Sequence, residues 1–107
     1  MNKILTLLGF ATKAGRLSFG FNSAMDSVKA GKAKLVVTAC DLSEKTSKEV
    51  NFYCDKNFVK VLRLSTADIQ TVSEAVGRKC GIVSVNDSGF AQALLGAYTQ
   101  GGNANDE

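Results

Sequence analysis

Two hydrophobic periodicities alternate along this 107-residue sequence, and their order restricts the fold more than any single motif does. Apolar residues recur at spacings of three and four around Ile4, Phe21, Val50, Ile69 and Phe90, which is typical of helices that bury one face. Short strand-like runs, mostly rich in β-branched residues, separate these segments at residues 17–19, 34–39, 59–64 and 81–85. The order α-β-α-β-α-β-α-β-α predicts a three-layer α/β/α sandwich around a small, about four-stranded mixed sheet.

The chain length fits one compact domain, which we place at residues 1–98. Residues 99–107 read "TQGGNANDE" and lack an apolar anchor, so we expect a disordered tail there. The first segment, "MNKILTLLGFATKAG", has apolar residues at helical spacing and polar interruptions, which favours an amphipathic helix over a signal peptide. No run is long enough to cross a bilayer. We therefore expect a cytoplasmic monomer that does not bind membranes.

The sequence has three cysteines, Cys40, Cys54 and Cys80, and no histidine. The cysteines are far apart, odd in number and set in apolar sequence, which argues against both a zinc site and a disulfide framework. Three buried, reduced thiols are the simplest interpretation. We expect neither a metal nor a cofactor.

The polar residues do not form a recognisable catalytic motif. Without histidine the usual general base is missing, and "GFNSAMDS" has too few glycines for a nucleotide-binding fingerprint. Asp41, Asp68 and Asp87 each stand at a predicted helix start, where a carboxylate is more economically a cap than a catalyst. Ser65, three residues ahead of Asp68, indicates a capping box. An enzyme is therefore not expected.

The stretch "LSFGFNSAMDSVKAGKAKLVV" predicts a turn at Gly20 followed by an amphipathic helix. A helix N-terminus offers free backbone N–H groups and a partial positive charge, which suit phosphates and base edges. Asn22 either caps this helix or presents its side-chain amide to a base. We expect six basic residues near this helix start: Lys13, Arg16, Lys32, Lys34, Arg78 and Lys79. Such a cluster is often only a solvated face, and the formal net charge of +3 points only weakly to a polyanionic partner.

Two separated stretches, "GFNSAMDSVKAGKAKLVVTACDLSEKT" and "SEAVGRKCGIVSVNDSGFAQAL", resemble the kink-turn-binding ribosomal protein superfamily, which includes large-subunit proteins seven-Ae and thirty-e. The resemblance is strongest to the small bacterial YlxQ-type members and extends over most of the chain, including the strand-to-helix junction "VNDSGFA". It implies the same α/β/α sandwich. It also implies a non-enzymatic, ribosome-associated protein that binds a kink-turn or similar structured RNA, with ribosomal RNA as one candidate partner. A kink-turn is a sharp bend built on tandem sheared G·A pairs.

The resemblance also implies where RNA would bind. In members of the superfamily, the start of the second helix reads the G·A edges, and the loop before the last strand contacts a flipped-out nucleotide. The corresponding RNA-binding residues here are Gly20, Phe21, Asn22, Ser23 and Asp26 on the helix, Gly77, Arg78 and Lys79 in the loop, and the phosphate-neutralising Arg16, Lys32 and Lys34.

Four positions depart from the pattern of the superfamily. Ser23 replaces a frequent glutamate, Asp26 replaces a base-contacting lysine, and Val72 and Ser73 replace a leucine-glycine pair. These changes leave a second function open, a protein-interaction module of the same fold without RNA binding. A third, a reader domain detached from an RNA methyltransferase, is disfavoured because the chain has no cofactor site. A basic surface around Gly20 would favour RNA, and a flat apolar surface would favour a protein partner.

Overall fold

The computed structural model describes residues 3–100 of the chain. It contains five helices and four strands in the predicted order within those residues. The elements are α1 (Lys3–Lys13), β1 (Leu17–Phe19), α2 (Gly20–Lys29), β2 (Leu35–Thr38), α3 (Glu44–Lys56), β3 (Lys60–Arg63), α4 (Ile69–Val76), β4 (Ile82–Val85) and α5 (Ser88–Gln100). Helix α5 therefore continues for two residues beyond the domain end predicted at 98. Residues 101–107 of the predicted tail lie outside the described residues.

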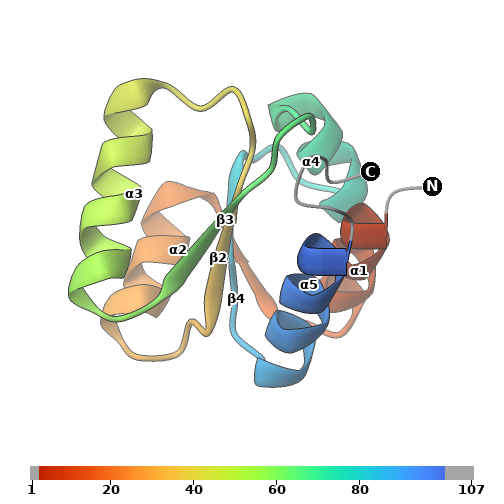
Figure 1. Cartoon of the computed structure of the whole chain (residues 1–107), viewed down its shortest axis with the longest axis horizontal. Coiled ribbons are helices and arrows are strands. Elements are labelled where there is room, and N and C mark those ends of the chain that lie inside the picture. Colours follow the sequence, from red (N-terminus) through yellow and green to blue (C-terminus); the bar gives the residue numbers. More distant parts are fainter. Residues whose placement is uncertain (1–2, 101–107) are drawn as a thin grey trace.

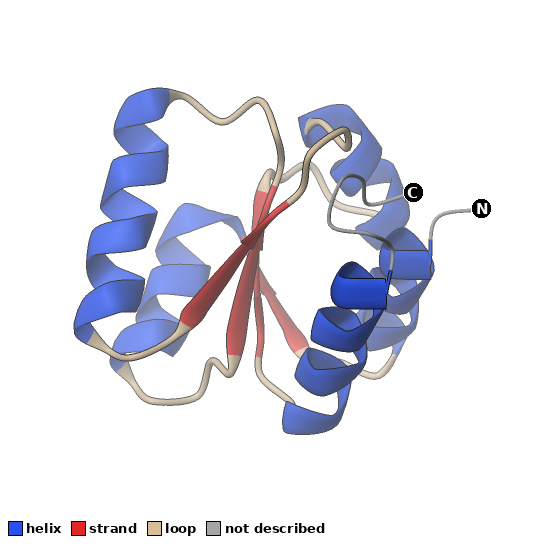
Figure 2. Cartoon of the chain, in the orientation of Figure 1, coloured by secondary structure: helices blue, strands red, loops and turns tan. Residues whose placement is uncertain are grey.

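The four strands form one mixed sheet in the order β1-β4-β2-β3. Strands β2 and β3 are parallel, with Leu35 opposite Lys60, whereas β4 is antiparallel to both β1 and β2. Helices cover both faces of this sheet (Figures 1 and 2): α2 and α3 lie on one side, and α1, α4 and α5 on the other. The predicted three-layer α/β/α sandwich is confirmed.

Alternation of side chains along the central strands produces two separate cores. Leu35 and Val37 of β2 face the larger core, which receives buried residues from α1, α4 and α5. Val36 faces the smaller core, where it packs with Ala24, Met25 and Val28 of α2 and with Val50 and Cys54 of α3. Because successive strand residues point to opposite faces, a central strand in such a sandwich is buried at every position and is mostly apolar. All four residues of β2 and of β4 are indeed buried.

Polar side chains fix the starts of three helices. The Ser43 hydroxyl accepts a hydrogen bond from the Thr46 N–H at 3.2 Å, and an Asp87 oxygen accepts one from the Phe90 N–H at 2.9 Å. Asp68 accepts a hydrogen bond from the Thr71 N–H at 2.8 Å. Hydrogen bonding with Thr71 lowers the pKa of the Asp68 carboxyl. The prediction that these aspartates are caps is confirmed for Asp68 and Asp87.

Two details of the capping prediction are corrected. The N-cap of α4 is Asp68 itself, so the capping box that would begin at Ser65 is wrong. Asp41 does not cap α3, which it precedes, because Ser43 occupies that position. It caps α4 instead, accepting a hydrogen bond from the Ile69 N–H at 2.8 Å. This hydrogen bond joins residues 28 positions apart in sequence. It can form because the β2–α3 and β3–α4 connections leave the parallel strands β2 and β3 at the same end of the sheet.

The sheet has two ends with different neighbours. We define the Gly20 end by residues 20–23, where α2 begins, and by the loop residues 77–79. We define the Phe58 end by residues 29–34, between α2 and β2, and by residues 56–60, between α3 and β3. Strand register separates them, because Phe19 pairs with Val83 near the Gly20 end whereas Leu35 pairs with both Val85 and Lys60 near the Phe58 end. The 10 residues of α2 connect the two ends, over roughly 15 Å at 1.5 Å per residue.

Candidate nucleic-acid interface

Helix α2 begins at Gly20 without a side-chain cap. Its N-cap residue is Phe19, which is in an extended conformation and whose side chain makes no capping hydrogen bond. The possible role of Asn22 as the N-cap is therefore wrong: Asn22 is the third residue of the helix, and its side chain is exposed. Gly20 has φ +86°, a conformation that favours glycine, so the turn predicted there is present.

The missing cap leaves backbone donors at this helix start. The first N–H groups of an α-helix have no partner within the helix, and α2 has neither a capping side chain nor an acidic residue in its first turn. Its positive end is therefore not neutralised locally, unlike the starts of α3, α4 and α5. The Gly20 N–H interacts with the Cys80 thiol, which leaves the N–H groups of Phe21 and Asn22 for a ligand.

The loop from Gly77 to Lys79 lies directly beside this helix start. The guanidinium carbon of Arg78 lies 4.7 Å from the centre of the Phe19 ring, a cation–π contact. Cys80 follows in the same loop and meets Gly20; burial raises the pKa of its thiol, although the Gly20 N–H and the nearby Arg78 charge partly oppose that rise. The two segments that the sequence associated with RNA, residues 20–23 and 77–79, are thus brought together.

Ser73 fixes the geometry of that loop. Its hydroxyl accepts a hydrogen bond from the Cys80 N–H at 3.0 Å and lies 2.6 Å from the Ile69 carbonyl oxygen, to which it donates. Gly77 ends α4 in the left-handed conformation, with φ +76°. Sequence reasoning noted Ser73 only as a departure from the superfamily pattern and missed Phe19 altogether. A serine four residues before a helix-ending glycine was the available signal for the first; nothing in sequence marks the second.

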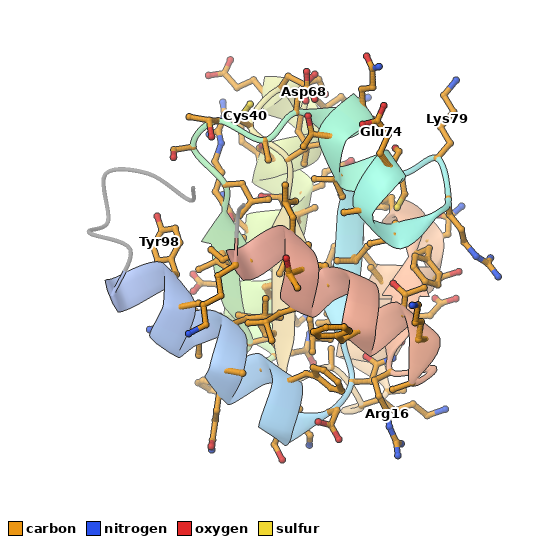
Figure 3. All side chains as sticks on the ribbon, turned by 90° about the vertical axis from the view of Figure 1, so that its right-hand side faces the viewer. Arg16, Cys40, Asp68, Glu74, Lys79 and Tyr98 are labelled. Carbon is orange, nitrogen blue, oxygen red and sulfur yellow. The ribbon has the colours of Figure 1, made fainter. Side chains whose placement is uncertain are left out.

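The structure does not bring all predicted basic residues to this site. Lys79 lies at the Gly20 end, whereas Arg16 lies at the opposite end of the molecule (Figure 3). Backbone pairing gives the same result, since the Arg16 carbonyl accepts from the Asn86 N–H and the Lys34 N–H donates to the Val85 carbonyl. The expectation that Lys13, Arg16, Lys32 and Lys34 surround the start of α2 is therefore wrong. The physical reason is that they stand at the end of α1, or between α2 and β2, where the chain has already crossed the sheet.

The remaining predicted residues divide into a surface and an anchor. Asn22, Ser23 and Asp26 are exposed, and Asp26 lies four residues beyond Asn22 on the same face of α2. Phe21 is partly buried and packs against the smaller core. It therefore holds the helix start against the sheet, and any contact that it makes with a ligand must come from its exposed part or its backbone N–H.

The three cysteines and the acidic residues do not form a metal site within residues 3–100. No group of three or more histidine, cysteine, aspartate or glutamate side chains in that range could hold a metal ion. The cysteines are free thiols: Cys54 and Cys80 are buried and Cys40 is half-buried. No helix in the same range is long and apolar enough to span a bilayer.

Comparison with known proteins identifies the family. The model of the Ribosomal protein L7Ae/L30e/S12e/Gadd45 family matches residues 2–95. The chain belongs to this family. Within it, the chain is 30% identical over 90 residues to the RNA-binding protein YlxQ of Bacillus subtilis (strain 168), covering 83% of this chain and 88% of YlxQ. It is 28% identical over 89 residues to the large ribosomal subunit protein eL30 of Candida glabrata, covering 81% of this chain and 84% of that protein.

Solved structures agree with this assignment to the L7Ae/L30e family. A Bacillus halodurans C protein of unknown function superposes with a TM-score of 0.84 at 27% identity, covering 90% of this chain and 96% of that one. The Giardia lamblia 15.5kD RNA binding protein superposes with a TM-score of 0.74 at 18% identity, covering 86% and 81%, which shows a common fold. The resemblance to YlxQ-type members of the superfamily is confirmed.

Proposed function

We propose that this member of the L7Ae/L30e family binds structured RNA at the Gly20 end and recognises a kink-turn or a similarly bent element. One observation carries the proposal: an uncapped helix start and a basic loop form a single surface, joined by the contact of Arg78 with Phe19. The names of relatives support the RNA partner, since YlxQ is called an RNA-binding protein and eL30 a large ribosomal subunit protein. A bent ribosomal RNA is therefore a sensible first ligand, with the protein in the cytoplasm and acting by binding alone.

The chemistry of the surface suits the irregular part of an RNA. Sequence-specific RNA recognition mostly uses unstacked bases and backbone in loops and bulges, because side chains cannot read the deep groove of a regular A-form helix. The exposed Asn22 amide can donate to and accept from a base edge. The N–H groups of Phe21 and Asn22 can donate to phosphate or base oxygens, and Arg78 and Lys79 supply positive charge.

The protein-interaction alternative fits the Gly20 end less well. A docking surface for a protein would be expected to expose large apolar side chains. Among the described residues, the large hydrophobic side chains that are exposed are Phe10, Phe52 and Phe58, and none of these lies at the Gly20 end. The exposed side chains there are Asn22, Ser23, Arg78 and Lys79, which are polar or basic.

Binding to two RNAs of equal length tests the proposal. One carries a kink-turn and the other is an unbent duplex, and each is titrated with protein at several salt concentrations. We expect tighter binding of the kink-turn, and affinity that decreases as salt increases because bound lysines and arginines release counterions from the RNA. Equal, weak binding of both RNAs at low salt would contradict the proposal.

A further inference from the structure

Within residues 3–100, three helices end in the same backbone motif, and one of them departs from its usual residue preference. In the Schellman motif, the residue after the C-cap is left-handed, and two N–H groups bond back to carbonyls in the last helical turn. Helix α1 ends in this way at Gly15 (φ +70°), and α2 at Gly31 (φ +78°). Helix α3 has the same bonds, from the Phe58 N–H to the Asp55 carbonyl and from the Val59 N–H to the Cys54 carbonyl, but its left-handed residue is Phe58 (φ +59°).

Phe58 costs stability at this position without contributing to the core. A residue with a Cβ is strained at positive φ, which is why glycine predominates there. The Phe58 side chain is 97% exposed, so its ring gains nothing from burial. Folding alone therefore favours glycine at position 58, as at positions 15 and 31. The ring instead projects from a fixed backbone into solvent, as a contact for a partner would.

The surroundings of Phe58 are basic and aromatic. Its neighbours along the chain include Lys56 and Lys60, and Lys32 and Lys34 lie in the adjacent α2–β2 connection, because Leu35 pairs with Lys60. All four lysine side chains are exposed. The two connections lie side by side at the lower left of Figure 1.

Further aromatic rings continue along α3. Phe52, which is 61% exposed, makes an edge contact with Tyr53 at 5.4 Å between ring centres. The Lys56 ammonium lies 5.9 Å from the Phe52 ring centre, and the Lys29 ammonium lies 4.5 Å from that of Tyr53. Lys29 and Lys56 stand in the last turns of α2 and α3, where a cation also offsets the helix dipole. Lys32, Lys34 and Lys60 lie beyond the helices and have no such explanation.

A groove opens beside Phe58, between α3 and the edge strand β3. Its volume is about 480 Å³, and its lining residues are Asn51, Cys54, Asp55, Val59, Lys60 and Val61. Cys54, Val59 and Val61 are apolar, whereas Asn51 and Asp55 offer an amide and a carboxylate. An apolar floor with a few hydrogen-bonding groups is the environment that a planar nucleobase requires.

We propose that the Phe58 end is a second binding surface, for single-stranded RNA. Phe58 stacks on an unpaired base, the adjacent groove accepts a neighbouring base, and Lys32, Lys34 and Lys60 hold the phosphates. Exposed aromatic rings set among lysines are the combination that single-strand binding uses, because every base has a face to stack and every nucleotide has a charge to neutralise. Charge complementarity favours RNA over an apolar protein surface, since lysines surround the ring where a protein interface would have further apolar side chains.

This surface is distinct from the kink-turn site. It lies at the other end of α2. One RNA could therefore occupy both surfaces only if an unpaired strand extends from the kink-turn along α2. The proposal goes beyond the proposed function and can fail independently of it. Binding of a blunt-ended kink-turn does not require the Phe58 end, whereas binding of an unpaired oligonucleotide does.

The test is fluorescence anisotropy of the full chain with a labelled, unstructured 12-nucleotide RNA and, separately, with a blunt-ended kink-turn. The decisive variant is Phe58→Gly, because glycine suits the backbone at position 58 and should preserve the fold. We expect it to weaken binding of the single strand by roughly 10- to 100-fold, the effect of removing one stacking aromatic ring. Phe58→Tyr should retain binding, since tyrosine keeps the stacking face. Lys60→Ala should lower the log-log salt slope by about 0.7, the increment per phosphate contact on a single strand.

Phe10→Ala is the matched control. It also removes an exposed phenylalanine, 55% accessible, but from α1 on the opposite face of the sheet, and it should leave both RNAs bound as before. Single-strand binding that survives Phe58→Gly, or that falls equally with Phe10→Ala, overturns the proposal. The proposal is also overturned if the wild-type chain does not bind the single strand but self-associates in sedimentation equilibrium, and if Phe58→Gly abolishes that association. This end would then be a protein interface.

Discussion

The two ends of the sheet differ in which helix termini they present, and this decides which groups can attract RNA. Helices α2, α3 and α4 begin at the Gly20 end, where α4 also ends, whereas α1, α2 and α3 end at the Phe58 end, where α5 begins. Helix N-termini carry free N–H donors and a partial positive charge, and C-termini carry free carbonyls and a partial negative charge. At the Gly20 end the backbone itself favours an anion. At the Phe58 end three helix C-termini meet one N-terminus, that of α5, which the Asp87 carboxylate caps, so the backbone disfavours an anion and side chains must supply the positive charge. Lysines are concentrated there.

The two ends also differ in backbone strain. At the Gly20 end, positive φ values fall on glycines, Gly20 and Gly77, so the backbone is unstrained. At the Phe58 end, the left-handed position after α3, which usually carries glycine, is occupied by Phe58. Glycine occupies the equivalent position after α1 and α2, so the phenylalanine after α3 departs from the local preference. Such a departure is a stronger indication of a binding role than the presence of charge alone.

The largest effect that would sharpen the comparison is expected from Asn22→Ala at the Gly20 end. Loss of an amide that is buried against a base should weaken kink-turn binding by about 1 to 3 kcal/mol, since the RNA groups lose their partner. Because Asn22 is exposed and does not cap the helix, the melting temperature should hardly change. A titration and a thermal melt of the same variant measure both. A drop in stability with unchanged RNA affinity would mean that Asn22 is structural.

Ser73→Ala should have the next largest effect, on the free energy of unfolding. The Cys80 N–H would lose its hydrogen-bond acceptor in a partly buried loop, at a cost of about 1 to 2 kcal/mol. The loop carrying Arg78 and Lys79 would also become less ordered, so kink-turn affinity should fall. Denaturant unfolding measures the first effect. Single-strand binding at the Phe58 end serves as the control and should not change.

Phe58→Gly and Gly31→Ala form a reciprocal pair at the Phe58 end. Relief of a strained left-handed residue should raise the free energy of unfolding by about 0.5 to 1 kcal/mol in the first variant, and introduction of strain should lower it by a similar amount in the second. A Cβ at position 31 meets no atom within 4 Å, so its effect reports the backbone conformation alone. If Phe58→Gly instead destabilised the protein, the ring would be making packing contacts that its exposure does not indicate.

The smallest effect concerns Asp26, which lies between the two ends on the exposed face of α2. Its carboxylate should repel phosphates that pass along the helix, so Asp26→Lys should strengthen kink-turn binding modestly and steepen the log-log salt dependence by about one unit. Asp26→Asn separates removal of the negative charge from the addition of a positive one. A loss of affinity on this change would show that Asp26 accepts a hydrogen bond from the RNA or lies off its path.

Much of the interface was predictable because it depends on local sequence. Gly20 was identified from its place before a predicted helix, and it adopts positive φ, as does Gly77, which the resemblance to a family placed in the loop. The pairing of residues 20–23 with residues 77–79 came from the resemblance to a family, since sequence spacing alone does not say which loops meet. Asn22 could not be assigned as a cap or a free amide, because helix boundaries shift by one or two residues for reasons of packing. In the structure Phe21 packs against the smaller core, and the N-cap is Phe19, three residues before Asn22.

The sequence by itself determined the element order, the layers and the apolar faces, because periodicities of two and 3.6 are properties of the local chain. It also determined which side chains are available for RNA, and that these include lysines and arginines but no histidine. Only the tertiary structure decided where those side chains lie. Lys32 and Lys34 follow α2 in sequence and were expected near its start, but a helix of 10 residues carries the chain across the whole sheet before they occur. Because α2 ends at that side of the sheet and β2 pairs in parallel with β3, Lys32 and Lys34 lie beside Phe58. No local sequence pattern predicts this contact between distant segments.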